Sequence, residues 1–224
     1  MFKENIVVLD IDGTLTDSIA QHQRAFERAL SSFGFPALRT DWSAYRHHSD
    51  SGIFAEAWEE ARWQHAPDLK RLEEGFIEAF DTEIGIAPLL PIAGAPEFLI
   101  ALEHSNWIPV FATGSLRHGA LRKLACLNVS YDADLLVTAS DYATREDIVS
   151  NAIERAKLKH EISGVDRIVS IGDGIWDLKT ARNLGLEFLG IGFGEKGEKL
   201  RAEGARVHEG FGDGLAMLSN LPRI

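Results

Sequence analysis

The sequence predicts an α/β fold: a doubly wound parallel sheet with an inserted α-helical domain. Short apolar runs rich in β-branched residues recur along the chain, as expected for strands buried on both faces. From about residue 90 onward these runs alternate with helical patterns, whereas residues 17–90 contain helical patterns without a convincing strand. Such alternation is typical of parallel sheets with right-handed crossovers, in which ligands bind beyond the carboxyl ends of the strands.

The first predicted strand covers residues 6–9, a continuous apolar run that ends in an Asp-Ile-Asp-Gly turn. Later strands are predicted at 108–112, 135–138, 167–171 and 187–191, with a last candidate at 205–208. Helical patterns lie between them, at 95–103, 116–124, 145–157 and 175–184.

The insert is expected to be helical, because amphipathic patterns occur at residues 53–65 and 69–80. We therefore predict that residues 1–16 and 91–224 form the α/β core and that residues 17–90 form a cap domain. The insert leaves the core just after the first strand, so it should lie over the strand ends as a lid.

Composition is that of an ordinary globular protein, with 45% hydrophobic and 25% charged residues among 224. The net charge of -11 disfavours nonspecific attraction to nucleic acid or to anionic membrane surfaces, and we expect neither as a partner. An anionic substrate would then need a local cation. The single cysteine, Cys126, excludes an intramolecular disulfide and fits a reducing compartment. With no signal-peptide pattern, a cytoplasmic location is expected.

Two acids end the first predicted strand. Asp10 and Asp12 are separated by one residue, so an extended backbone points both carboxylates to the same side. One carboxylate can then attack a substrate while the other exchanges a proton with the leaving group. A plain Asp-Gly turn that closes the strand is the alternative interpretation.

Two further strands end in polar residues. At one, Thr113 and Gly114 precede Ser115 and open a helix whose N-terminus can hold a phosphate, although a simple helix cap has the same pattern. At the other, Asp173 and Asp177 stand four residues apart at a strand-to-helix junction, where Asp173 could also be a cap. With Asp10 these acids offer the oxygen ligands that Mg²⁺ prefers.

In their order and spacing, these motifs resemble the haloacid dehalogenase-like superfamily over nearly the whole chain. The motifs that carry the resemblance are residues 10–18 (DIDGTLTDS), residues 113–115 (TGS), and Gly172-Asp173 followed by Asp177. The resemblance is to members with a helical cap, such as phosphoglycolate phosphatase and β-phosphoglucomutase. It implies that Asp10 attacks phosphorus, that Asp12 protonates the leaving oxygen, and that Thr113 and Gly114 bind the transferring phosphoryl group.

The resemblance also implies a magnesium cofactor. The ion would be held by the side chain of Asp10, the backbone carbonyl of Asp12 and the carboxylate of Asp173, with Asp177 in the metal shell. The cation of the family's third motif is usually a lysine, often followed by proline, and this sequence lacks that pair. Arg145 stands where the cation should fall, and a guanidinium offers phosphate a charged planar fork. An exposed helical arginine is the alternative reading of Arg145, and Lys123 is a second candidate for the cation.

We therefore expect a Mg²⁺-dependent phosphatase that hydrolyses a small phosphorylated metabolite through an aspartyl-phosphate. The acid at position 12 argues against dehalogenation, because dehalogenases of the superfamily generally lack one there. A phosphomutase similar to β-phosphoglucomutase stays open as an alternative. Residues 192–197 (GFGEKG) formally fit a dinucleotide-binding fingerprint, but too little chain follows them to complete such a fold.

Substrate choice is expected to lie in the cap. Arg46, His47 and Asp50 concentrate polar groups just before a predicted helix, and we predict that they contact the non-phosphate part of the substrate. A solvated loop with Asp50 or Ser51 as helix cap is the alternative. The architecture carries many specificities, so neither the substrate nor the oligomeric state follows from the sequence.

Overall fold

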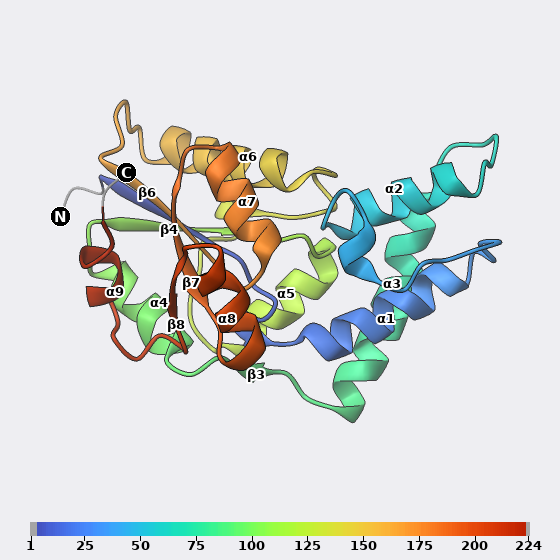
Figure 1. Cartoon of the computed structure of the whole chain (residues 1–224), viewed down its shortest axis with the longest axis horizontal. Helices are drawn as coiled ribbons and strands as arrows, with labels where there is room; N and C mark the ends of the chain where they lie inside the picture. The colour runs from blue at the N-terminus through green and yellow to red at the C-terminus, as the bar shows by residue number, and fades with distance from the viewer. Residues whose placement is uncertain (1–3, 223–224) are drawn as a thin grey trace.

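The predicted fold class is confirmed by the computed structural model, which describes residues 4–222. A six-stranded sheet has the order β5-β4-β1-β6-β7-β8, and every pair in it is parallel (Figure 1). Its strands are β1 (Asn5–Leu9), β4 (Trp107–Ala112), β5 (Leu136–Val137), β6 (Arg167–Gly172), β7 (Glu187–Ile191) and β8 (Arg206–His208). β1 pairs on both sides and has helices packed on both faces, so all of its residues are buried.

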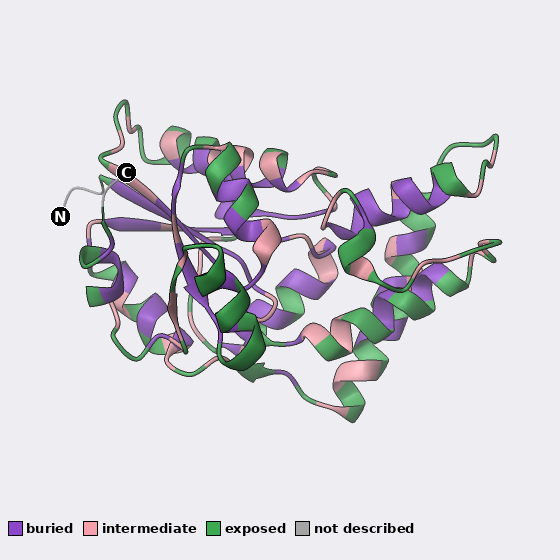
Figure 2. Cartoon of the chain, in the orientation of Figure 1, coloured by how far each residue is buried: buried purple, intermediate pink, exposed green. Residues whose placement is uncertain are grey.

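Alternate residues of β1 face opposite layers of helices, as the period of a strand requires. Val7 and Leu9 pack on one face with α4 (Ala95–Glu103), α5 (Arg117–Cys126) and α9 (Ala216–Ser219). Ile6 and Val8 pack on the other face with α6 (Arg145–Lys159) and α7 (Ile175–Asn183). Figure 2 shows the buried strands between helices whose outer surfaces are exposed. The remaining helix of this part of the chain is α8 (Gly194–Ala202).

The insert is helical, as predicted, and consists of α1 (Ile19–Ser31), a 3₁₀ turn η1 (Trp42–Ala44), α2 (Asp50–Glu60) and α3 (Leu69–Ile86). It forms a lobe beside the carboxyl ends of the strands (Figure 1). Its interior is rich in aromatic rings that contact one another, among them Phe54, Trp58 and Phe76. Because these rings pack mainly on one another, the insert has a core of its own.

An antiparallel pair of very short strands joins the insert to the sheet. β2 (Thr16–Asp17) pairs with β3 (Leu90–Pro91), with Asp17 opposite Leu90. The sequence did not indicate this pair, because two residues are too few to display the alternation of a strand. The pair lies at the predicted boundaries of the cap, residues 17 and 90, which stay a prediction.

Local capping explains where the elements differ from their predicted bounds. α2 begins at Asp50 rather than at residue 53, because the hydroxyl of Ser49 accepts a hydrogen bond from the backbone N–H of Gly52. β5 is shorter than predicted because Leu135 ends the 3₁₀ turn η2 (Ala133–Leu135), which is capped by Asp132. Among residues 4–222, no helix is both long and apolar enough to cross a membrane.

An ion pair joins the first residues of β6 and β7, and its arginine also bonds the segment around α9. Nε of Arg167 in β6 donates to Glu187 of β7 at 3.0 Å, and its Nη atoms donate to the carbonyls of Leu218 and Leu221 at 2.9 and 3.0 Å. Both charged side chains are only 9% exposed. We expect Glu187→Ala to lower the free energy of unfolding by about 3 kcal/mol, since it leaves a buried guanidinium without its counter-charge.

Urea denaturation measures this loss. The control is Glu154→Ala, which removes an exposed pair with Lys157 and should cost less than about 1 kcal/mol. Equal losses in the two variants would contradict the buried pair's structural role.

Candidate active site

Three buried carboxylates meet at the ends of neighbouring strands. Asp10 directly follows β1 and Asp173 directly follows β6, while Asp177 lies in the first turn of α7. One carboxylate oxygen from each lies within 4.8 Å of the other two. The backbone N–H of Asp10 still donates to the carbonyl of Ile171 in β6 at 3.0 Å, so the hydrogen bonds of the sheet hold Asp10 beside the end of β6.

The turn after Asp12 passes close to this cluster. Gly13 has a φ of +74°, in the left-handed region that favours glycine. A Cβ at this position would collide with the carboxylate of Asp173. Glycine is therefore required for the turn to pass the acid at the end of β6.

Arg145, the first residue of α6, reaches this cluster. Its Nη2 donates to Oδ1 of Asp10 at 3.2 Å and also to Asp177, and its side chain is 8% exposed. The guanidinium therefore lies in the site rather than on an exposed helix face. Burial lowers its pKa, but the carboxylates of Asp177 and Asp10 outweigh that effect and hold the pKa above its ordinary value. The group is a permanent cation beside Asp10.

The acids of the cluster carry more negative charge than their side-chain partners balance. Burial, and then the charge of Asp177, raise the pKa of Asp10 well above its ordinary value despite Arg145. Burial likewise raises the pKa of Asp173 to about 6, although Nζ of Lys196 donates to it at 2.7 Å. A set of buried carboxylate oxygens with raised pKa values is suited to a hard divalent cation.

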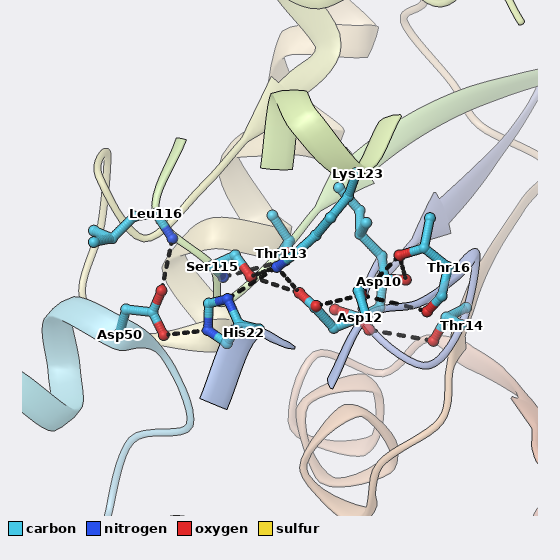
Figure 3. Close-up of polar contacts among 12 residues, drawn as sticks. Asp10, Asp12, Thr14, Thr16, His22, Asp50, Thr113, Ser115, Leu116 and Lys123 are labelled. Atoms are coloured by element: carbon cyan, nitrogen blue, oxygen red, sulfur yellow. Dashed lines mark hydrogen bonds and ion pairs between the residues drawn. The ribbon is translucent and has the colours of Figure 1, made fainter. Parts of the chain in front are cut away.

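Asp12 lies beside the cluster in a different environment. Its carboxylate accepts hydrogen bonds from Ser18 Oγ at 2.6 Å, Ser115 Oγ at 2.5 Å and Lys123 Nζ at 2.6 Å (Figure 3). Burial alone would raise its pKa, but the ammonium of Lys123 and these hydrogen bonds hold the pKa well below its ordinary value. Asp12 is thus held as a carboxylate by its partners, whereas burial and the neighbouring acids oppose the ionisation of Asp10.

A chain of polar contacts continues from Asp12 into the insert. Nζ of Lys123, whose side chain is fully buried, lies 3.0 Å from Nδ1 of His22. Nε2 of His22 lies 3.0 Å from Oδ1 of Asp50, whose Oδ2 accepts from the backbone N–H of Leu116 at 2.8 Å (Figure 3). Because an ammonium can only donate, Nδ1 accepts and Nε2 donates its hydrogen to Asp50. We call Asp12, Lys123, His22 and Asp50 the polar chain.

The start of α2 rests on the loop after β4. The backbone N–H of Asp50 donates to the carbonyl of Gly114 at 2.7 Å, and the hydroxyl of Ser49 donates to the carbonyl of Ala143. A Cβ at Gly114 would lie 2.5 Å from the carbonyl oxygen of His48. The small residue at 114 therefore allows the insert to close onto the loop that carries Thr113, whose side chain is buried.

Arg46, His47 and Asp50, which were predicted to contact the non-phosphate part of the substrate, lie in different surroundings. Arg46 is 67% exposed and its Nη2 pairs with Glu59 at 3.0 Å, away from the acids. Within residues 4–222, Asp50 is the one of the three predicted residues that lines the cavity between insert and core; Arg46 and His47 do not. The oxygens of Asp50 already belong to the polar chain. Contact of these residues with a substrate stays a prediction.

Several polar residues of the site were not assigned a role from the sequence. Lys123 was only a second candidate for the cation at Arg145, and the structure instead bonds it to Asp12. The available signal was its position eight residues after Ser115, about two helical turns along a predicted helix. His22 gave no signal, since its partners come from distant segments. Lys196 lies in the glycine-rich stretch 192–197, so that stretch brings a cation to Asp173.

The chain is similar to known proteins in both sequence and fold. A family model described as haloacid dehalogenase-like hydrolase matches residues 4–185. A hydrolase from Pseudomonas syringae is 24% identical with a TM-score of 0.73, covering 97% of this chain and 99% of its own. CbbY from Rhodobacter sphaeroides, solved with phosphate, is 18% identical with a TM-score of 0.70, covering 98% and 100%.

A putative β-phosphoglucomutase from Bacteroides vulgatus is 18% identical with a TM-score of 0.69, covering 99% of this chain and 92% of its own. At such identities, similarity to these solved structures shows the fold alone. No match was found among curated protein sequences.

The contact between Asp12 and Lys123 predicts strong coupling of the two residues. Lys123→Met should lower the free energy of unfolding by about 3 kcal/mol, because it leaves the mostly buried carboxylate of Asp12 without its cation. Asp12→Asn should be destabilising for the reciprocal reason. In the double variant the loss should be smaller than the sum of the two single losses, by at least about 1 kcal/mol, as measured by urea denaturation. Additive losses would contradict a direct interaction.

Proposed function

The chain belongs to the haloacid dehalogenase-like hydrolase family, and on that basis we propose that it is a magnesium-dependent phosphatase of small phosphorylated metabolites. The observation that carries this proposal is the buried cluster of Asp10, Asp173 and Asp177 with Arg145 beside Asp10. A nucleophilic carboxylate next to a permanent cation suits the transfer of an anionic phosphoryl group.

Asp10 is proposed as the nucleophile. Thr14 Oγ1 donates to its Oδ2 at 3.2 Å, and Arg145 donates to its Oδ1 at 3.2 Å, so both oxygens are oriented. As the bond from Asp10 to phosphorus forms, the bond to the leaving oxygen breaks and that oxygen takes up a proton. Thr113 and Gly114 are proposed to bind the phosphoryl oxygens, whose charge Arg145 would balance.

Asp12 is proposed to move the protons. Its ionised, hydrogen-bonded carboxylate is suited to accept a proton from the water that hydrolyses the aspartyl-phosphate. The proton then held by Asp12 can pass to the leaving oxygen of the next substrate. Lys123 and Ser115 orient the carboxylate for both steps.

The acids fit Mg²⁺, because the donors are buried carboxylate oxygens that lie close together, and burial raises the pKa values of Asp10 and Asp173. Asp10, Asp173 and Asp177 would hold the ion through their side chains, and Asp12 through its backbone carbonyl. When bound, the ion would supply positive charge to the transferring phosphoryl group and relieve the repulsion among the acids.

A panel of phosphorylated metabolites, assayed for phosphate release with and without Mg²⁺, tests the function. We expect Asp10→Asn to be inactive, because an amide cannot form the acyl phosphate, and Asp12→Asn to lose about 10²–10⁴-fold in kcat. The matched control is Asp17→Asn, an exposed acid of the same motif, which should retain activity. Isomerised sugar phosphate in place of free phosphate would indicate a mutase. Undiminished turnover by chelator-treated protein would contradict the proposed role of the metal.

Binding of the ion should also be visible without turnover. At a Mg²⁺ concentration near 100 times the dissociation constant, the native state should gain about 2.7 kcal/mol, seen as a higher Tm. Asp173→Asn should abolish most of this gain, since it removes one carboxylate of the cluster. Glu198→Gln, an exposed acid on α8, should respond like wild type. A Tm that Mg²⁺ leaves unchanged in the wild type would argue against the site.

A further inference from the structure

We propose that the substrate is a monophosphate ester whose leaving group carries no anionic group and presents an apolar or aromatic surface to the insert. This inference rests on the proposed function and narrows it to a class of substrate. It comes from the charges and the shape of the cavity between insert and core.

The cavity has two chemically different ends. Its core end holds Asp10, Asp12, Thr113 and Arg145, the groups proposed to handle the phosphoryl group. Its insert side carries four large apolar side chains, Ile19, Phe26, Trp42 and Ile53, beside the polar Gln23, Thr40, Asp41 and Ser43, and the core adds Trp176. A leaving group bonded to a phosphoryl group at the core end would extend toward these apolar walls.

The structure describes all of residues 17–90, and none of the lysines or arginines among them lines this cavity. The charged groups that it does contribute are the acids Asp41 and Asp50. Nearby arginines of the insert are engaged elsewhere: Arg39 pairs with Glu60 at 2.6 Å and Arg46 pairs with Glu59 at 3.0 Å. A second phosphate or a carboxylate would therefore meet no lysine or arginine on the insert side of the cavity.

The lysine and arginine that line the cavity, Lys196 and Arg145, both come from the core. Arg145 is bonded to Asp10 and Asp177, and Lys196 to Asp173. The two histidines of the lining also have partners. His22 belongs to the polar chain, and the ring of His48 stacks on that of Trp176 with 5.1 Å between the ring centroids. Burying an unpaired anion is costly, so an anionic leaving group would bind poorly.

The aromatic walls suit a flat or apolar leaving group. The rings of Phe26 and Trp42 contact each other, with 5.5 Å between their centroids, and both line the cavity. The cavity volume of 360 Å³ is near the low end of the range of about 300–1,000 Å³ for small-molecule sites. It suits a phosphoryl group with a leaving group the size of one ring.

A matched pair of substrates tests the charge argument. Benzyl phosphate and 4-carboxybenzyl phosphate share the reacting bond and the ring and differ by a distal carboxylate. With Mg²⁺ present, we expect kcat/KM to be at least about tenfold higher for benzyl phosphate, because the carboxylate would lie unpaired among apolar groups. Equal or faster turnover of the carboxylated substrate would overturn the inference.

Two variants probe the walls. Ser43→Lys adds a cation to an exposed position of the lining. It should raise kcat/KM for 4-carboxybenzyl phosphate and so reduce the preference for benzyl phosphate. Its control is Ser163→Lys, which adds the same charge on an exposed loop of the core and should keep the wild-type preference. Trp42→Ala should lower kcat/KM for benzyl phosphate while sparing methyl phosphate, which cannot reach the wall. A preference that Ser43→Lys and Ser163→Lys alter equally would count against the inference.

Binding separates failure of this inference from failure of the proposed function. Benzylphosphonate and 4-carboxybenzylphosphonate cannot be hydrolysed, and their affinities with Mg²⁺ can be measured by calorimetry. Tighter binding of benzylphosphonate supports the inference even if no phosphate is released from any ester, a result that would overturn the phosphatase proposal alone. Equal binding, preferred binding of the carboxylated compound, or no binding of either would overturn the inference.

Discussion

The crowding of carboxylates at the end of the sheet is the constraint on which the site depends. Asp10, Asp173 and Asp177 are buried with oxygens within 4.8 Å of one another, and such like charges are unstable together without cations. Arg145 and Lys196 supply part of the compensation, while burial, together with the charge of neighbouring acids, still raises the pKa values of Asp10 and Asp173. The remaining negative charge is what makes the cluster suited to a divalent ion and, through it, to an anionic substrate.

The parallel sheet produces this crowding by its topology. β1 lies between β4 and β6, so the residues that follow these three strands emerge at one edge, and Gly13 lets the turn after β1 pass Asp173. The compensating cations come from helices that follow other strands, since Arg145 begins α6 and Lys196 lies in α8. The same arrangement gives the two acids of the first motif different surroundings. Asp10 lies among other acids, whereas the charge of Asp12 is balanced by Lys123.

The insert completes the site from the other side. The polar chain links Asp12 to Asp50, and the start of α2 rests on the loop that carries Thr113 and Gly114. The closed position of the insert is therefore held by residues adjoining those proposed to act on phosphate. Its inward surface carries large apolar side chains and no lysine or arginine, so recognition of negative charge is concentrated in the core and the insert offers shape and apolar contact.

The sequence by itself determined the fold class, the helical insert and the strand ends at which Asp10, Thr113 and Asp173 lie, because buried strands and helix periodicity leave local patterns. It also indicated Arg145 as the site's cation, since the residue begins a helix in the expected interval. Tertiary structure alone decided that Lys123 pairs with Asp12 and that His22 meets Asp50, because these contacts join segments between 28 and 111 residues apart. It likewise decided the orientation of Arg46 and the chemistry of the cavity, since neither the direction of a loop side chain nor the shape of a cavity between two lobes is encoded in a local pattern.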